Sequence, residues 1–190
     1  INVHHHADLL QNYLLKQYPN LNFSFSNERE ELLDTGGALL HARSLLSETN
    51  DFLVHNVDII LPFNTLDMLR YHKSQKALFT LAVSDRKSSR KLLFNNHGQL
   101  CGWANSDTGE IRKALNYTEQ NHALAYSGVQ YVNPLLFTIE ERIGRFSIID
   151  TWLDCCHKYP ILSFEHSQDG WFDLGSQKKI HDAEQNSGKQ

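Results

Sequence analysis

The sequence has few cysteines and no long hydrophobic run. Its three cysteines, Cys101, Cys155 and Cys156, are an odd number without the spacing of a disulfide framework or a metal site, which predicts buried thiols in a reducing compartment. No apolar run approaches the ~20 residues that span a bilayer. The first residues also lack a basic region followed by a hydrophobic stretch. These absences predict a cytoplasmic protein with no membrane partner.

An excess of positive charge is absent as well. The formal net charge is −4, and no run of Lys and Arg covers one face of a predicted element. Nothing in the charge therefore attracts a polynucleotide, and we expect no nucleic-acid partner. The 190 residues, 41% of them hydrophobic, can bury one substantial core, and no internal repeat or low-complexity linker divides them. We therefore predict a single domain over residues 1–190.

Strand and helix patterns alternate along most of the chain. This alternation predicts a three-layer α/β/α fold with a mixed, mostly parallel sheet and right-handed crossovers. Residues 91–94 and 100–104 interrupt it and read as an antiparallel hairpin. The other strands are expected at 52–57, 77–83, 123–132, 161–164 and 171–174, and helices at 8–17, after 36–37, after 64, from 147 and from 176.

Two of these helices have an apolar stripe that should be buried. In the first helix the stripe consists of Leu9, Leu10, Tyr13 and Leu14, the spacing of a helix that covers a sheet. The helix after the two glycines has a similar stripe, formed by Ala38, Leu39, Ala42, Leu45 and Leu46.

Two aspartates follow predicted strands and are candidates for a metal site. Asp58 comes after the apolar run 52–57, and Asp173 lies between residues that would pack and hold it in place. In open α/β sheets ligands bind beyond the carboxyl ends of the strands. If both carboxylates meet at that edge they would bind Mg²⁺, which bridges phosphates. The alternative for each is a simple turn role, Asp173 before Gly175 in particular.

Glycines mark two places where the backbone would approach a ligand. Thr35-Gly36-Gly37 begins a helix, where free N–H groups can donate to a phosphate or a base edge, although an ordinary tight turn would explain it too. Gly128 follows Ser127 inside a strand, which indicates close backbone approach or a bulge.

Six short blocks, in order and spread over nearly the whole chain, resemble the sugar-1-phosphate nucleotidyltransferase family. Members include mannose-1-phosphate guanylyltransferases, N-acetylmuramate-1-phosphate uridylyltransferases and glucose-1-phosphate thymidylyltransferases. The blocks are Ile1-Asn2-Val3-His4-His5, Asp34-Thr35-Gly36-Gly37-Ala38, His55-Asn56-Val57-Asp58-Ile59, Tyr126-Ser127-Gly128-Val129-Gln130, Phe146-Ser147-Ile148-Ile149-Asp150 and Trp171-Phe172-Asp173-Leu174-Gly175-Ser176.

The resemblance implies a Rossmann-like, GT-A-like fold and a Mg²⁺-dependent reaction between an NTP and a sugar 1-phosphate that gives an NDP-sugar and pyrophosphate. Asp58 and Asp173 would be the catalytic metal ligands. The substrate-binding residues would be Thr35, Gly36, Gly37, Asn56, Gly128 and Asp150, with Gly36 and Gly37 against the nucleobase and Gly128 facing the sugar. Relatives range from monomers to tetramers, so a homo-oligomer is one expected assembly.

The chain departs from the family pattern in three places. The Gly-rich segment with its Arg and a later Lys would precede the strand that ends at Val3, so we expect an N-terminally incomplete domain that is inactive alone. Val57 stands where the family commonly has Gly. Residues 102–105 stand where many members have Glu-Lys-Pro. A replacement cation would come from Arg86, Lys87, Arg90 or Lys113, and the alternative for each of these is a solvated surface charge.

Two other functions stay open at this point. A GT-A-type glycosyltransferase also has an acidic metal-binding motif after a strand, as Asn56-Val57-Asp58 would be. A noncatalytic sugar-nucleotide sensor would be a relative that has lost the phosphate-binding segment.

Overall fold

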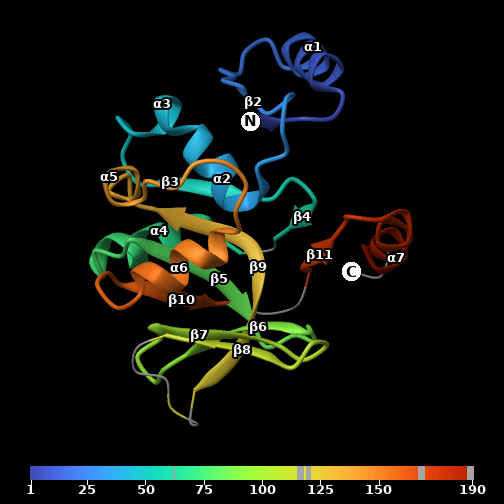
Figure 1. The fold of residues 1–190 in the computed structure, drawn as a ribbon. Helices are drawn as coiled ribbons and strands as arrows, with labels where there is room; N and C mark the ends of the chain where they lie inside the picture. Colours follow the sequence, from blue (N-terminus) through green and yellow to red (C-terminus); the bar gives the residue numbers. More distant parts are fainter. Residues whose placement is uncertain (62, 115–117, 119–120, 167–169, 188–190) are drawn as a thin grey trace. The chain divides into compact units, whose positions relative to one another are not determined.

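The computed structural model describes residues 1–61, 63–114, 118, 121–166 and 170–187, and it divides the chain into two compact units (Figure 1). Unit 1 contains residues 1–50 and 134–151, and unit 2 contains residues 51–133 and 152–190. The single domain expected over residues 1–190 stays a prediction. We describe the two units separately.

Unit 1 is mainly helical and has one short parallel strand pair. β1 pairs with β2 in parallel, with Asn2 opposite Ser26. The elements of this unit are β1 (Asn2–Val3), α1 (Ala7–Gln17), β2 (Ser26–Asn27), α2 (Asp34–His41), α3 (Arg43–Leu46), α5 (Leu136–Ile139) and the first half of α6 (Ile148–Cys155).

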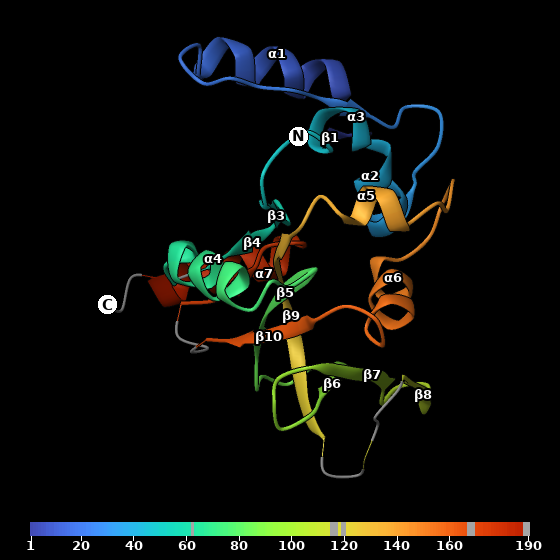
Figure 2. The ribbon, with the colours of Figure 1, turned by 90° about the vertical axis from the view of Figure 1, so that its left-hand side faces the viewer.

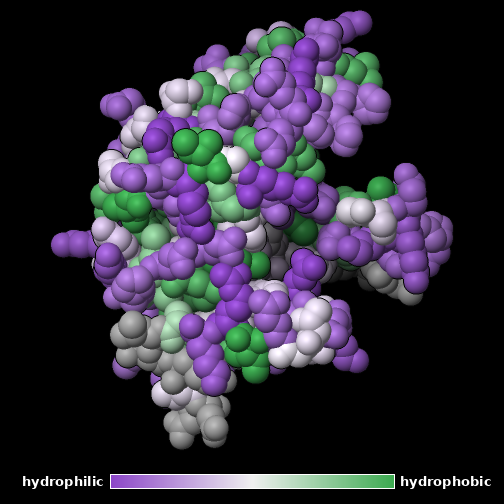
Figure 3. Space-filling view, in the orientation of Figure 1, coloured by the Kyte–Doolittle hydropathy of each residue, from purple (hydrophilic) through white to green (hydrophobic). Residues whose placement is uncertain are grey.

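The predicted helices of unit 1 form, but their apolar stripes are not buried as expected. In α1 only Ala7 is buried, whereas Leu9, Leu10 and Tyr13 are exposed. Figure 3 shows hydrophobic side chains on the surface over this helix. The helix after the glycines breaks at Ala42 into α2 and α3, and Leu45 is exposed. The spacing of apolar residues predicts that a segment is helical, but it does not predict which part of the protein covers the apolar face of the helix.

Unit 2 is built on a seven-stranded sheet. Its strand order is β10-β5-β9-β6-β7-β8, and β3 pairs with β9 off this path. A separate two-stranded ladder joins β11 and β4. The elements are β3 (Phe52–His55), β4 (Ile59–Ile60), α4 (Thr65–Ser74), β5 (Phe79–Ser84), β6 (Arg90–Phe94), β7 (Leu100–Asn105), β8 (Glu110–Lys113), β9 (His122–Val132), β10 (Ile161–Glu165), β11 (Phe172–Asp173) and α7 (Gln177–Ser187).

The α/β class and the mixed sheet are confirmed, but the expected excess of parallel strands is wrong for the described residues. Only β1–β2 and β10–β5 are parallel, and the other strand pairs are antiparallel. β3 lies within the strand expected at 52–57 of a mostly parallel sheet, but it runs antiparallel to β9 and is half-exposed. The reason is the route of the chain, which leaves β5 through the hairpin and returns beside it along β9.

That hairpin forms as predicted. β6 and β7 pair antiparallel, with Lys91 opposite Ala104 and Leu92 opposite Trp103. Asn95 and Gly98 close the turn through a 2.9 Å backbone hydrogen bond, with Gly98 at φ 72°. Turn chemistry and alternation are both local properties of the sequence, so this element was predictable without tertiary information.

Helices cover both faces of the sheet of unit 2, which gives the three expected layers. On one face α4 buries Met68 against Ala82, Val129 and Tyr131. On the other face Trp152, at the unit 2 end of α6, lies against Phe79, with ring centroids 6.4 Å apart. Figures 1 and 2 show α4 and α6 on opposite sides of β5 and β9. Each large apolar side chain buried in this way contributes about 1.5–3 kcal/mol.

Candidate functional site

The structure brings Asp58 and Asp173 together in unit 2. Asp58 follows β3, and its carbonyl oxygen accepts a 2.6 Å hydrogen bond from the Leu174 N–H. The β4–β11 ladder continues this contact, with Asp173 opposite Ile59. A methyl group on the Cα of Gly175 would lie 2.9 Å from Asp58 Oδ2 and 3.1 Å from Asp173 Oδ1. Two carboxylate oxygens therefore face one small space that only a glycine leaves open.

The Asp173 carboxylate is held by two hydrogen bonds, one from a backbone N–H and one from a lysine. Oδ1 accepts a 2.9 Å hydrogen bond from the Gly175 N–H, and Lys179 Nζ lies 2.6 Å from Oδ2. Partial burial opposes ionisation, but these hydrogen bonds and the charges of Lys179 and Arg86 hold the pKa of Asp173 below its ordinary value. The carboxylate is thus ionised and oriented at neutral pH.

Asn56 and Gly128 meet beside this pair of carboxylates. The Asn56 N–H donates to the Gly128 carbonyl over 2.9 Å, and Gly128 has a φ of 82°, which favours glycine. A Cβ there would lie 2.6 Å from Ile59 Cγ1 and 3.3 Å from Asn56 Nδ2. The β5–β9 register shifts at the same level, so the irregularity predicted at Gly128 is confirmed. Backbone conformation and packing already require this glycine.

A cation–aromatic cluster that the sequence reading missed borders the site. The Arg86 guanidinium lies 4.1 Å above the Trp171 ring and donates a 2.7 Å hydrogen bond to the Tyr126 carbonyl. Trp171 Nε1 donates to the Ser127 carbonyl over 3.2 Å. Burial lowers the pKa of Arg86, and the charge of Asp173 partly offsets this effect. Of the four cations considered from the sequence, Arg86 is therefore one that interacts with Asp173.

The other predicted binding residues belong to unit 1. The N–H groups of Gly36 and Gly37 both donate to the Phe146 carbonyl, at 3.0 and 3.3 Å, so the expectation that these amides are free for a ligand is wrong. A Cβ on Gly36 would collide with the Phe146 ring, and one on Gly37 with the Gly144 carbonyl. Both positions require glycine because they pack against the segment before α6 that contains Gly144 and Phe146.

Thr35 and Asp150 both lie near the start of α6, just after the segment that contains Gly144 and Phe146. Thr35 Oγ1 accepts a 3.0 Å hydrogen bond from the Ile148 N–H at the start of α6. Asp150 lies in the first turn of α6, where an acidic side chain interacts favourably with the helix dipole. Their roles in substrate binding, like those of Gly36 and Gly37, stay predictions.

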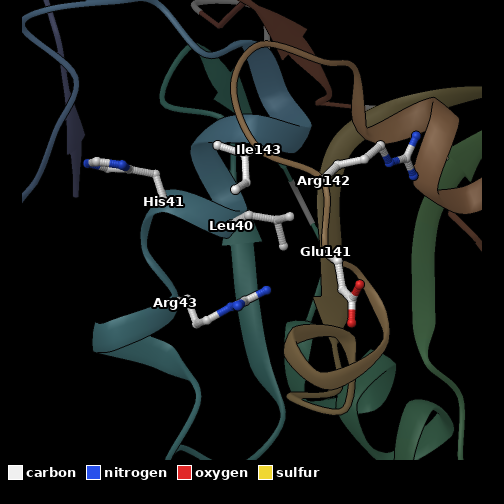
Figure 4. A pocket seen from close by; sticks show the side chains of 6 residues that line it. All are labelled: Leu40, His41, Arg43, Glu141, Arg142 and Ile143. Atoms are coloured by element: carbon white, nitrogen blue, oxygen red, sulfur yellow. The ribbon is translucent and has the colours of Figure 1, made fainter.

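Unit 1 also contains a pocket that no sequence pattern indicated. Its volume is about 410 Å³, and its lining residues come from α2, α3 and the segment after α5 (Figure 4). These residues are Leu40, His41, Arg43, Glu141, Arg142 and Ile143. None of the predicted site residues lines it.

Within the described parts of the chain, no group of three or more His, Cys, Asp and Glu side chains is arranged to hold a metal ion. Among these same residues, no helix is both long enough and apolar enough to cross a membrane.

Comparison with curated proteins finds relatives of one kind. The chain is 35% identical over 189 residues to the mannose-1-phosphate guanylyltransferase catalytic subunit beta of Dictyostelium discoideum, covering 93% of this chain and 47% of that protein. It is 36% identical over 80 residues to the corresponding subunit of Xenopus tropicalis, covering 41% of this chain and 22% of that one. The chain thus spans about half the length of the first relative. A scan of protein-family models finds no match.

Solved structures share the fold over nearly the whole chain. HddC from Yersinia pseudotuberculosis matches with a TM-score of 0.72 at 18% identity, over 98% of this chain and 76% of that one. A putative glucose-1-phosphate thymidylyltransferase from Bacillus anthracis matches with a TM-score of 0.73 at 14% identity, over 100% and 76%. At these identities the structures show the fold alone. Together with the curated relatives they confirm the resemblance drawn from the six sequence blocks.

Proposed function

We propose that this chain, a relative of the sugar-1-phosphate nucleotidyltransferases, is part of an enzyme that transfers a nucleotidyl group from an NTP to a sugar 1-phosphate. The observation that carries the proposal is the convergence of Asp58 and Asp173 on the space beside Gly175. The relatives are named for this chemistry, and the curated ones for GTP and mannose 1-phosphate. We therefore expect that pair of substrates to be the first to test.

We assign Asp58 and Asp173 as ligands of Mg²⁺. Their fit is chemical as well as spatial, because this hard cation takes oxygen ligands and is commonly bound by one or two carboxylates, water and substrate phosphates. One oxygen of each carboxylate lies about 3 Å from the position that a Gly175 Cβ would take, and Asp173 Oδ1 also accepts a hydrogen bond from the Gly175 N–H, so the two carboxylates form such a donor set. When bound, the ion would neutralise charge on the phosphates and polarise the phosphoryl oxygens.

The proposed reaction needs no covalent intermediate with the protein. A phosphate oxygen of the sugar 1-phosphate attacks the α-phosphorus of the NTP, a new P–O bond forms, and the bond to the leaving pyrophosphate breaks. The residues of unit 2 would contribute by positioning: the Gly128 backbone would face the sugar, Asn56 would bind the substrate, and the carboxylate pair would lie at the phosphates. Catalysis of this kind comes from orientation and electrostatic stabilisation. Thr35, Gly36, Gly37 and Asp150 are proposed to contact the nucleotide.

The test is a pyrophosphate-release assay on the protein encoded by the complete gene, with each NTP paired with common hexose 1-phosphates. We expect release with one pair in the presence of Mg²⁺. Asp58→Asn keeps the shape of the side chain but removes its charge, so we expect turnover to fall by about 10²-fold or more. Full activity of Asp58→Asn, with Mg²⁺ present, would contradict the proposed role.

The same samples distinguish the two alternatives. Transfer of a sugar from an NDP-sugar to an acceptor, without pyrophosphate release, would identify a glycosyltransferase. Tight binding of an NDP-sugar with no turnover of any pair would identify a sensor. The cytoplasmic location, the homo-oligomer and the absence of a nucleic-acid partner stay predictions from the sequence.

A further inference from the structure

A lysine forms an ion pair with one of the two carboxylates assigned to the metal. Lys179 Nζ lies 2.6 Å from Asp173 Oδ2, while the other oxygen of the same carboxylate, Oδ1, faces the space beside Gly175. The lysine side chain is 51% exposed and that of Asp173 is 31% exposed. The ion pair is thus open to solvent on the lysine side, and the ammonium can leave without disturbing a buried group.

The position of Lys179 in its helix is electrostatically unfavourable on its own. It lies in the first turn of α7, where its N–H donates to Ser176 Oγ over 3.3 Å. Cations are normally disfavoured at a helix N-terminus, where the helix dipole is positive. The ammonium therefore gains its stabilisation from the Asp173 carboxylate and not from the helix.

We propose that Lys179 is an exchangeable counter-ion of the carboxylate pair, an inference that rests on the proposed function. Without a divalent cation the ammonium neutralises Asp173 and reduces its repulsion with Asp58. When the cation binds, Lys179 leaves Asp173 and pairs with a phosphate of the nucleotide. A lysine suits this exchange because its charge sits on a flexible four-carbon chain with three rotatable donors.

The exchange couples the two ligands. The metal alone binds next to the positive charge of the ammonium and competes with it for the negative charge of Asp173, which weakens metal binding, whereas a bound nucleotide offers the ammonium another anion. Metal and nucleotide therefore bind more tightly together than separately, because each relieves a cost of the other. The coupling depends on the charge of Lys179 and not on the shape of its side chain.

The experiment measures Mn²⁺ binding to the complete protein by the electron paramagnetic resonance of free Mn²⁺, first alone and then with GTP. Lys179→Met removes the charge and keeps most of the length. Since exposed ion pairs are weak, we expect this variant to bind Mn²⁺ alone about two- to fivefold more tightly than the wild type. With Mn²⁺ present, it should bind GTP more weakly. Lys178→Met, in the exposed neighbouring residue, is the matched control and should change neither value.

The outcomes separate this inference from the proposed function. If Asp58→Asn and Asp173→Asn bind Mn²⁺ as tightly as the wild type, the assigned metal site itself is wrong. If both aspartate variants lose Mn²⁺ but Lys179→Met binds it no more tightly than the wild type, only the counter-ion inference is overturned. An equal effect of Lys178→Met would also overturn it, because a general change of surface charge would then suffice.

Discussion

At the scale of single residues, Gly175 is more informative than its sequence context indicated. The Trp171 to Ser176 block suggested a turn glycine after Asp173. In the structure its missing side chain leaves the space into which Asp58 and Asp173 both project an oxygen. Unlike Gly128, it does not have a positive φ, so the backbone itself would accept another residue. The glycine is needed for the space and not for the turn.

Gly175→Ala tests this interpretation. The added methyl group would lie 2.9 Å from Asp58 Oδ2, so the carboxylates must move apart or the space is filled. We expect Mn²⁺ binding, followed by calorimetry, to weaken by about tenfold or more, which corresponds to 1.4 kcal/mol. Because Gly175 is exposed, the free energy of unfolding should change by only about 0.5 kcal/mol. Unchanged Mn²⁺ affinity in a folded variant would show that the ion, if bound, does not use this space.

At the scale of elements, α6 shows how one side chain ties a helix to the sheet. Trp152 is almost fully buried, its ring meets that of Tyr126 edge to face at 5.0 Å, and its Nε1 donates to Gln130 Oε1 over 3.2 Å. Gln130 is itself buried, so the tryptophan supplies both apolar packing and the partner of a buried amide. The sequence predicted the helix but not which residue would anchor it.

Trp152→Ala should destabilise the protein strongly. The change leaves a large cavity and an unpaired buried amide oxygen, and we expect a loss of about 3–5 kcal/mol in guanidinium unfolding. Trp152→Phe keeps an aromatic ring, so its loss should be smaller and should reflect mainly the hydrogen bond to Gln130. His157→Ala, an exposed change just beyond the helix, is the control. A loss below 1 kcal/mol for the alanine variant would contradict the anchoring role.

In unit 1 the segment after α5 is held by a partly buried ion pair, in which Glu140 is buried and Arg142 is partly exposed. Arg142 Nε donates to Glu140 Oε1 over 2.9 Å, and Thr151 Oγ1 donates to Glu140 Oε2 over 2.9 Å. The hydrogen bond from Arg142 is the main reason why the pKa of Glu140 falls to about 2. A carboxylate whose pKa is depressed by folding stabilises the fold above its unfolded pKa.

The pH dependence of Glu140→Gln checks this contribution. Glu140 has an ordinary pKa of 4.5, so its contribution is complete above that pH and disappears as the pH falls toward about 2. At pH 7 we expect the free energy of unfolding of the variant to be about 1 kcal/mol lower than that of the wild type. The difference should shrink between pH 4.5 and pH 2 in urea titrations. A difference independent of pH would mean that charge is not involved.

At the scale of the whole molecule, the two compact units raise the question of cooperativity. The chain was predicted to be one domain, because its size and composition suit a single core. Unit 1 combines residues 1–50 with 134–151, and unit 2 combines residues 51–133 with 152–190, so the chain passes from one unit to the other three times. A chain that crosses between the units in this way favours joint unfolding.

Hydrogen exchange followed by mass spectrometry tests the prediction of one domain. If it is right, peptides from residues 1–50 and from 77–105 lose their slow exchange at the same guanidinium concentration. Loss of protection in unit 1 well before unit 2 would show two separately unfolding parts. Fluorescence alone would not decide this, because Trp103, Trp152 and Trp171 all belong to unit 2.

The sequence by itself determined the features that depend on neighbours along the chain. The hairpin of β6 and β7, the strands β5 and β9 and the helices α1, α2, α4, α6 and α7 followed from periodicity and turn residues, and the six ordered blocks indicated the family. Tertiary structure alone decided the direction in which β3 pairs, the exposure of the α1 leucines and the partners of the Gly36 and Gly37 amides. The contact of Asp58 with Asp173 was implied by the family resemblance but by no local pattern, and the structure adds Lys179 as the partner of the Asp173 carboxylate. Residues more than a hundred positions apart become neighbours only when the chain folds, and no local pattern encodes that contact.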